Sequence, residues 1–228
     1  MAAAFTATII SRAIFGRATI FDIPDLQLLP ISYYGIVILV ALASGLAGVI
    51  FNWGLLNIGR FYSLPCFKRP VQKIAFALIC AVILGYFLPE VLGGGNNLIN
   101  HLAKAPVSLQ LLLLFLTGKL IFTLISYGCG VPGGFFLPML VIGALCGSIC
   151  AQILIMLGWI EPAYATNIMV VAMAALFASS VRAPITGTVL IMEMTAIYQQ
   201  LLSLAIAAMV AFVIAELCHS KPIYEELM

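Results

Sequence analysis

The chain has 228 residues, of which 64% are hydrophobic and only 8% are charged, and its mean hydropathy is +1.20. Soluble domains average about 45–50% apolar and 25% charged residues, so this composition excludes a soluble globular protein and indicates an integral membrane protein. The formal net charge of +2 gives no support for a nucleic-acid partner.

The first third of the sequence predicts two membrane spans joined by a basic linker. Residues 1–20 carry Arg12 and Arg17 after their apolar stretch. That order is wrong for a secretory signal, so we expect the end of a preceding helix there. Residues 30–57 and 73–88 are apolar and long enough to cross a bilayer. The linker region contains four cations: Arg60, Lys68, Arg69 and Lys73. The positive-inside rule places it on the cytoplasmic side.

The middle of the chain alternates short and long apolar segments. Residues 98–105 are too few to cross a membrane and predict a re-entrant or interfacial helix. Residues 109–127 form a span, and a further span is expected at 134–157 after a break rich in glycine and proline.

The last third predicts a broken helical hairpin and one final span. Residues 167–181 and 184–198 are both short for simple spans and are joined at Arg182. Residues 199–218 form the last span, and residues 219–228 are the expected start of a terminal helix. Full spans that alternate with interrupted ones are typical of transporters whose site lies between discontinuous helices.

Small residues predict close helix contacts at two places. Ser44, Gly45 and Gly48 form one such face, and Gly143 and Gly147 form a GxxxG face.

The strongest sign of function is the break that contains Gly130, Pro132, Gly133 and Gly134. Irregular backbone survives at membrane depth only where protein or a water-filled cavity surrounds it. We expect a new helix from Gly134 onward, with Pro138 in its first turn. Because a helix N-terminus exposes N–H groups and the positive end of the macrodipole, this position predicts an anion site.

Four blocks of the sequence resemble the ClC family of chloride channels and chloride/proton antiporters. Gly134-Phe135-Phe136-Leu137-Pro138 is similar to the family's G-x-F-x-P signature, with Phe135 at a position that is more often Ile or Val. The other three blocks, in chain order, are Gly93–Ile99, Arg182–Gly187 with Glu193-Met194-Thr195, and Lys221–Tyr224. They resemble the family's Gly-rich loop, its R-A-P-x-T-G and E-M-T elements, and its K-P-x-Y ending.

The resemblance implies an all-α fold with discontinuous and re-entrant helices. Residues 1–228 correspond to one ClC-type membrane domain fragment, from about the end of the family's helix I to the start of its helix R, with no CBS domain. Residues 30–218 would be the second of two inverted repeats. The first-half motifs G-S-G-I-P and G-[KR]-E-G-P are absent from the sequence. The chain is therefore expected to be a fragment or a truncated reading frame that lacks the gating and proton-coupling glutamates.

The resemblance also implies a set of chloride-binding residues. Phe135 and Phe136 would present backbone N–H groups to chloride while their rings line the path, and the Tyr224 hydroxyl would donate from the cytoplasmic side. Gly133, Gly134, Leu137 and Pro138 would complete the helix N-terminus and the pore backbone. The tyrosine favours the chloride-selective branch over fluoride exporters. The alternative for the two phenylalanines is a pair of core aromatics, and for Tyr224 an interfacial aromatic.

Three charged residues within apolar segments admit structural or functional interpretations. For Glu193 a hydrogen bond to a neighbouring helix is favoured over proton relay. Lys119 is expected to reach a helix end or the interface, and Arg182 to cap carbonyls at its turn. Either cation could instead raise the local potential for an anion. The six cysteines, His101 and His219 lack metal-ligand spacing, so we expect reduced packing cysteines, no metal and no cofactor.

Chloride transport by a ClC-type channel or antiporter is the function that the sequence favours, with chloride as the transported ligand and protons as the second ion of an antiporter. The alternatives are an inactive half-domain that needs the missing first half and an intramembrane enzyme, for which no catalytic motif is present. The lipid bilayer is the surroundings, and a bacterial plasma (inner) membrane is the expected location. Residues 184–218 are the expected homodimer contact.

Overall fold

The computed structural model describes residues 6–7, 9–10, 13–14, 20–21, 23, 27–67, 69–131, 133–196 and 198–226. The α-helices are α2 (Tyr34–Tyr62), α3 (Pro70–Phe87), α4 (Asn96–Lys104), α5 (Leu109–Gly128), α6 (Phe136–Met156), α7 (Ala165–Val181), α8 (Pro184–Thr195), α9 (Leu201–Leu217) and α10 (Ile223–Glu226). The 3-10 helices are η1 (Ile31–Tyr33), η2 (Pro65–Phe67), η3 (Pro89–Val91), η4 (Pro162–Tyr164) and η5 (Tyr198–Gln200). The helix end expected within residues 1–20 falls mostly outside the described residues.

Six helical stretches in the described part of the chain are long and apolar enough to cross a membrane. They are Ile31–Tyr62, Pro70–Phe87, Leu109–Gly128, Phe136–Met156, Pro162–Val181 and Tyr198–Leu217. The prediction of an all-α, multi-pass membrane protein is confirmed. Helix α4 has nine residues and a length of about 13 Å at 1.5 Å per residue, so it cannot cross a bilayer by itself.

Several predicted helix boundaries differ from the structure, and two of them change the interpretation. The segment ending at Val181 is not short, because η4 begins at Pro162 and continues directly into α7, which gives 20 helical residues. Proline favours the first position of a helix, where its missing N–H leaves no hydrogen bond unmade. Helix α6 begins at Phe136 and not at Gly134, since Gly133 and Gly134 have no regular structure and Phe135 is the N-cap.

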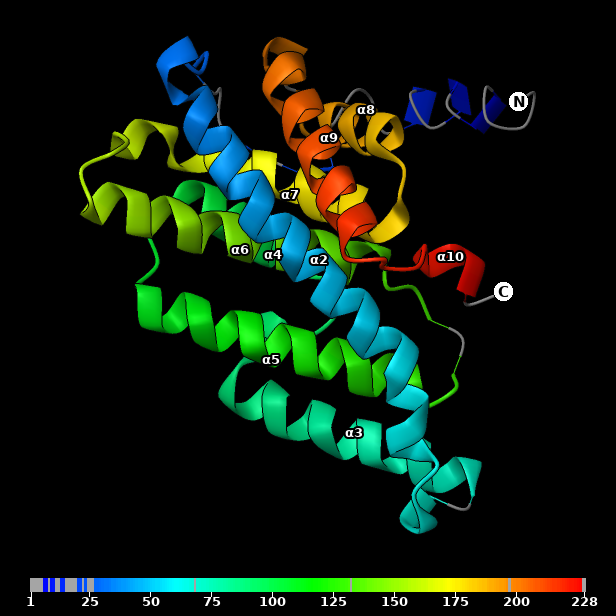
Figure 1. Ribbon diagram of the computed structural model, residues 1–228. Helices are drawn as coiled ribbons and strands as arrows, with labels where there is room; N and C mark the ends of the chain where they lie inside the picture. The colour runs from blue at the N-terminus through cyan, green and yellow to red at the C-terminus, as the bar shows by residue number, and fades with distance from the viewer. Residues whose placement is uncertain are drawn as a thin grey trace.

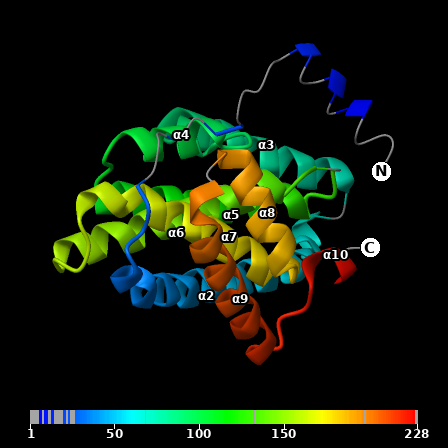
Figure 2. The same cartoon turned by 90° about the horizontal axis from the view of Figure 1, so that it is seen from above.

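Helix α7 is the centre of the molecule. Every residue from 167 to 180 is buried, and α7 contacts α6, α2, α9 and α8. Figure 1 shows α2 and α9 crossing over α7, and Figure 2 shows the same layers from above. A helix that is apolar on all sides is expected in such a position.

The predicted small-residue faces are confirmed as contacts within this core. A Cβ added to Gly147 would lie 2.6 Å from Met169 Cα of α7. A Cβ added to Gly45 would lie 3.1 Å from Ala211 Cα of α9. Close backbone approach of this kind is how membrane helices gain packing energy, because lipid supplies little hydrophobic driving force between them.

Helices α3 and α5 lie side by side along the lower edge of the molecule in Figure 1, and α3 contacts α5 and η3. Ala77 is the only residue of α3 that is buried. The six cysteines are all free, as expected, but Cys66 and Cys218 are exposed and so are not packing residues in this chain.

Candidate functional site

The break between α5 and α6 is built from glycines that leave the helical conformation. Helix α5 ends at Gly128, and Gly130 has a φ of +83°, a left-handed conformation that favours glycine. Gly133 and Gly134 follow without regular structure. Pro132, which the sequence placed in the break, lies outside the described residues. The chain turns here before it enters α6.

At the start of α6, several backbone N–H groups have no acceptor among the described residues. The first bond of the helical ladder runs from the Met139 N–H to the Phe135 carbonyl at 2.9 Å. Among the residues that the structure describes, no oxygen accepts from the N–H of Phe135, Phe136 or Leu137. Pro138 has no N–H to satisfy. Three adjacent donors therefore remain at the positive end of a 21-residue helix, which is an arrangement that binds anions.

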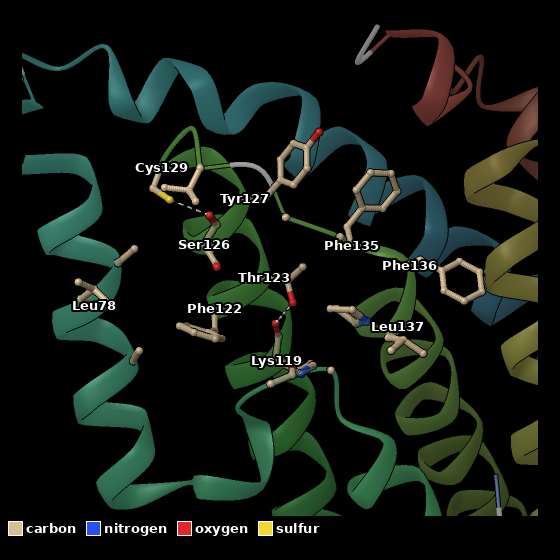
Figure 3. A pocket seen from close by; sticks show the side chains of 18 of the residues that line it. Leu78, Lys119, Phe122, Thr123, Ser126, Tyr127, Cys129, Phe135, Phe136 and Leu137 are labelled. Carbon is tan, nitrogen blue, oxygen red and sulfur yellow. Dashed lines mark hydrogen bonds between the residues drawn. The ribbon is translucent and has the colours of Figure 1, made fainter. Parts of the chain in front are cut away.

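These residues border a cavity of about 700 Å³ (Figure 3). Its wall consists of one face of α3, the Gly93-Gly94 loop, the second half of α5 and the break with the start of α6. Gly133, Gly134, Phe135, Phe136, Leu137 and Pro138 all belong to this wall, so the structure brings six of the seven predicted site residues together. The wall contains one cation and no carboxylate among the described residues.

The two phenylalanine rings have different surroundings. The Phe135 ring is 7% exposed and lies between the rings of Tyr127 and Tyr224, with centroids 5.4 and 5.3 Å away. The Phe136 ring points toward α7, where it meets Phe177 edge-on at 5.9 Å. Phe136 therefore borders the cavity, while its ring anchors the helix start in the core.

Tyr224, the seventh predicted residue, comes from α10 at the other end of the chain. It stacks on Phe135 but does not line the cavity. It is 43% exposed, and its hydroxyl makes no hydrogen bond to another described residue. Partial burial raises the pKa of this phenol above its ordinary value, so it is a neutral donor at physiological pH.

Lys119 is the cation in the cavity wall, and its residue is completely buried. Its Nζ donates to the carbonyls of Val91 and Gly93 at 2.8 and 2.7 Å, which confirms the expectation that it reaches a helix end. It forms no ion pair with a carboxylate of the described residues. Within the described part of the chain, the Lys119 ammonium is therefore compensated by backbone dipoles and not by an opposite charge.

The sequence also predicted hydrogen bonds for Arg182 and Glu193. Arg182 was expected to cap carbonyls at its own turn, but it donates instead to the carbonyls of Phe212 and Ala215 in α9 and of Ser220 after α9. Glu193 is exposed and makes no hydrogen bond to any described residue, so the expected structural bond is absent.

The sequence interpretation missed Asn52. This residue of α2 is 1% exposed, and its Nδ2 donates to the Ser180 carbonyl at 2.9 Å and to the Lys221 carbonyl at 3.1 Å. An asparagine in the middle of an apolar helix was the available signal, since buried polar groups in membranes carry structural or functional roles.

Comparison with known proteins agrees with this architecture. The H(+)/Cl(-) exchange transporters ClcA of Vibrio vulnificus and Salmonella agona are 34% and 33% identical to the chain over 99% of its residues. The chain spans 49% of each. A slow cyanobacterial Cl-/H+ antiporter of known structure has 31% identity and a TM-score of 0.85, covering 97% of this chain and 52% of its own.

A CLC-type fluoride/proton antiporter shares the fold, with a TM-score of 0.77 at 24% identity over 98% of this chain and 53% of its own. The chain thus spans about half the length of these relatives. Residues 1–216 match the family model described as voltage gated chloride channel. The chain belongs to that family.

Proposed function

We propose that this chain is the second half of a chloride-transporting membrane domain. Two findings support the proposal: the chain spans about half of its relatives, and those relatives are exchangers or antiporters of chloride and protons by name. Residues 30–218 are the second inverted repeat in this view, and residues 219–228 begin the terminal helix. A first half, as part of the same protein, is the partner that completes the pathway and supplies the groups that couple protons.

In this proposal, chloride binds at the start of α6. The observation that carries it is the set of free N–H groups of Phe135, Phe136 and Leu137 beside a cavity whose described wall has no carboxylate. Gly133 and Gly134 leave the approach to these amides free of side chains, and Pro138 closes the first turn without adding a competing donor. The Tyr224 hydroxyl is the side-chain donor, placed by its stacking on Phe135.

Neutral donors suit transport. A site must replace enough of the hydration of the ion to admit it and must still release it, which uncharged amides and a phenol allow. The ion itself is the only ligand that this mechanism requires, and no further cofactor enters it.

The same proposal assigns the outer face of α8 and α9 to contact with a second copy, within a bacterial inner membrane. Ile185, Leu202 and Leu217 are 77%, 61% and 74% exposed there. An apolar cavity of about 560 Å³ lies between the two helices. Such a surface is compatible with burial against protein in the membrane plane.

Titration of chloride into the purified 228-residue chain in detergent tests the proposed site. Isothermal calorimetry should give saturable heat with chloride and none with gluconate, an anion too large to approach the amides. No saturable heat with chloride would refute the site.

Chloride efflux from vesicles tests whether the first half is needed. We expect the reconstituted chain alone to give little or no flux, because half of the pathway is absent. Robust chloride-selective flux would contradict the proposed role of the first half, whereas hydrolysis of a membrane peptide by the purified chain would favour an enzyme.

A further inference from the structure

The segment that carries Tyr224 is held by two side chains distant from it in sequence. Residues 218–222 connect α9 to α10 and form a turn in which His219 has a φ of +50°. Asn52 of α2 and Arg182, which caps the end of α7, both donate to backbone carbonyls of this turn. Neither residue contacts chloride in the proposed function.

Three hydrogen bonds from Arg182 and Asn52 hold the backbone of this turn. Arg182 donates from Nε and Nη2 to the Ser220 carbonyl at 3.2 and 2.7 Å. Asn52 Nδ2 donates to the next carbonyl, that of Lys221, at 3.1 Å. Two consecutive carbonyls are thus fixed from α2 and from the C-cap residue of α7, and Pro222, with its restricted φ, follows directly.

Two residues, Pro222 and Ile223, separate the fixed Lys221 carbonyl from Tyr224. Ile223 is completely buried and anchors the first turn of α10. The Tyr224 ring then lies 5.3 Å from the Phe135 ring. Because the intervening residues are a proline and a buried isoleucine, a shift of the Lys221 carbonyl would be passed on to Tyr224.

Burial of the Asn52 side chain costs stability, and packing alone does not explain why an asparagine is there. Its Oδ1 is buried and accepts no hydrogen bond from the described residues, while its Nδ2 serves two carbonyls from different parts of the chain. A leucine at this place in an apolar helix would avoid the unpaired oxygen. A buried polar group with unmade hydrogen bonds lowers stability, so its presence indicates a role other than stabilising the fold.

We propose that Asn52 and Arg182 are positioning residues that hold the 218–222 turn so that the Tyr224 hydroxyl is directed to the anion at the start of α6. The inference rests on the proposed function, because it presumes that Tyr224 donates to chloride. It adds that the tyrosine donor is placed by the contact between α2, α7 and the turn, and not by α10 alone.

The test is a double-mutant cycle on chloride affinity, measured by calorimetry on the whole chain. Tyr224→Phe should weaken chloride binding about tenfold, since it removes one hydrogen bond to a charged group. Asn52→Leu should weaken binding by as much, because the Tyr224 hydroxyl is then no longer directed to the anion. The double variant should bind no more weakly than Tyr224→Phe alone, because the asparagine acts through the tyrosine. Asn57→Leu is the matched control, since Asn57 lies on the same helix and, among the described residues, its side chain donates only to the Trp53 carbonyl one turn earlier.

Hydrogen exchange gives a second measurement that does not depend on chloride. In Asn52→Leu the amides of residues 220–226 should exchange faster, while those of α6 and α7 keep their wild-type rates. If the leucine variant does not fold, Asn52→Ala replaces it, because water can then reach the two carbonyls.

The outcomes separate the two proposals. Absence of chloride binding by the wild-type chain overturns the proposed function and this inference with it. Wild-type binding that Asn52→Leu leaves unchanged overturns the inference alone, and so does an additive loss in the double variant.

Discussion

Replacement of a single amide by an ester at Phe136 tests the backbone origin of anion binding. The ester keeps the Phe136 side chain, its ring contact with Phe177 and the helical conformation, but it removes the N–H. A proline at position 136 would also remove the N–H, but it would change the backbone conformation as well. Phe135 has ψ near −2°, and a following proline disfavours that conformation.

The expected loss of chloride affinity follows from the removal of one of the three N–H donors at this helix start. A hydrogen bond to a charged group contributes about 1.5–3 kcal/mol net, and about 1.4 kcal/mol is tenfold in affinity. Loss of the Phe136 donor should therefore weaken chloride binding by about 10- to 150-fold. The ester also weakens the Phe135 carbonyl as acceptor of the Met139 N–H, so a modest loss of helix stability accompanies it.

Calorimetric titration with chloride measures the effect, and an ester at Leu145 controls for the loss of helix stability. Leu145 lies in the interior of α6, so its ester removes a ladder bond without touching the site. We expect the control to lower the unfolding temperature but to leave chloride affinity unchanged. Equal affinities for the Phe136 ester and the wild-type chain would refute the backbone account, whatever the effect of changing the ring.

The other predictions concern the donor, the core and the cap. Tyr224→Phe should weaken chloride binding about tenfold. The chloride affinity of the wild-type chain should stay constant with rising pH until the pH passes the raised pKa of the Tyr224 phenol, above which the phenolate repels the anion. Gly147→Ala should lower unfolding stability by about 1–3 kcal/mol because its Cβ would lie 2.6 Å from Met169 Cα, whereas Gly59→Ala, with no atom within 4 Å, should not. Arg182→Lys should lower the unfolding temperature, since an ammonium lacks the planar fork.

Features that depend on neighbours in sequence were predictable. The break before α6 follows from consecutive glycines. The small-residue face at Gly143 and Gly147 predicted a close helix partner, although the sequence did not say which helix it would be. That partner is α7.

Features that depend on distant parts of the chain were not predictable. Asn52 bonds to residues 128 and 169 positions away, and no local pattern indicates such partners. The start of α6 was wrong by two residues, because glycine permits a helical start at Gly134 but does not require one. The cavity wall likewise combines α3, a loop, α5 and α6, which only the tertiary structure brings together.

The charges around the cavity favour an anion over a cation at the break between α5 and α6. Burying a cation without a carboxylate partner costs stability, and the bonds from Lys119 to the Val91 and Gly93 carbonyls offset part of that cost. Those carbonyls are dipoles without net charge, so the wall keeps a positive potential that adds to that of the α6 helix start. A cation-binding site would need the opposite sign. Irregular backbone would be a defect in a lipid-facing helix, but here it borders a cavity in which an anion, as proposed, would satisfy the N–H donors.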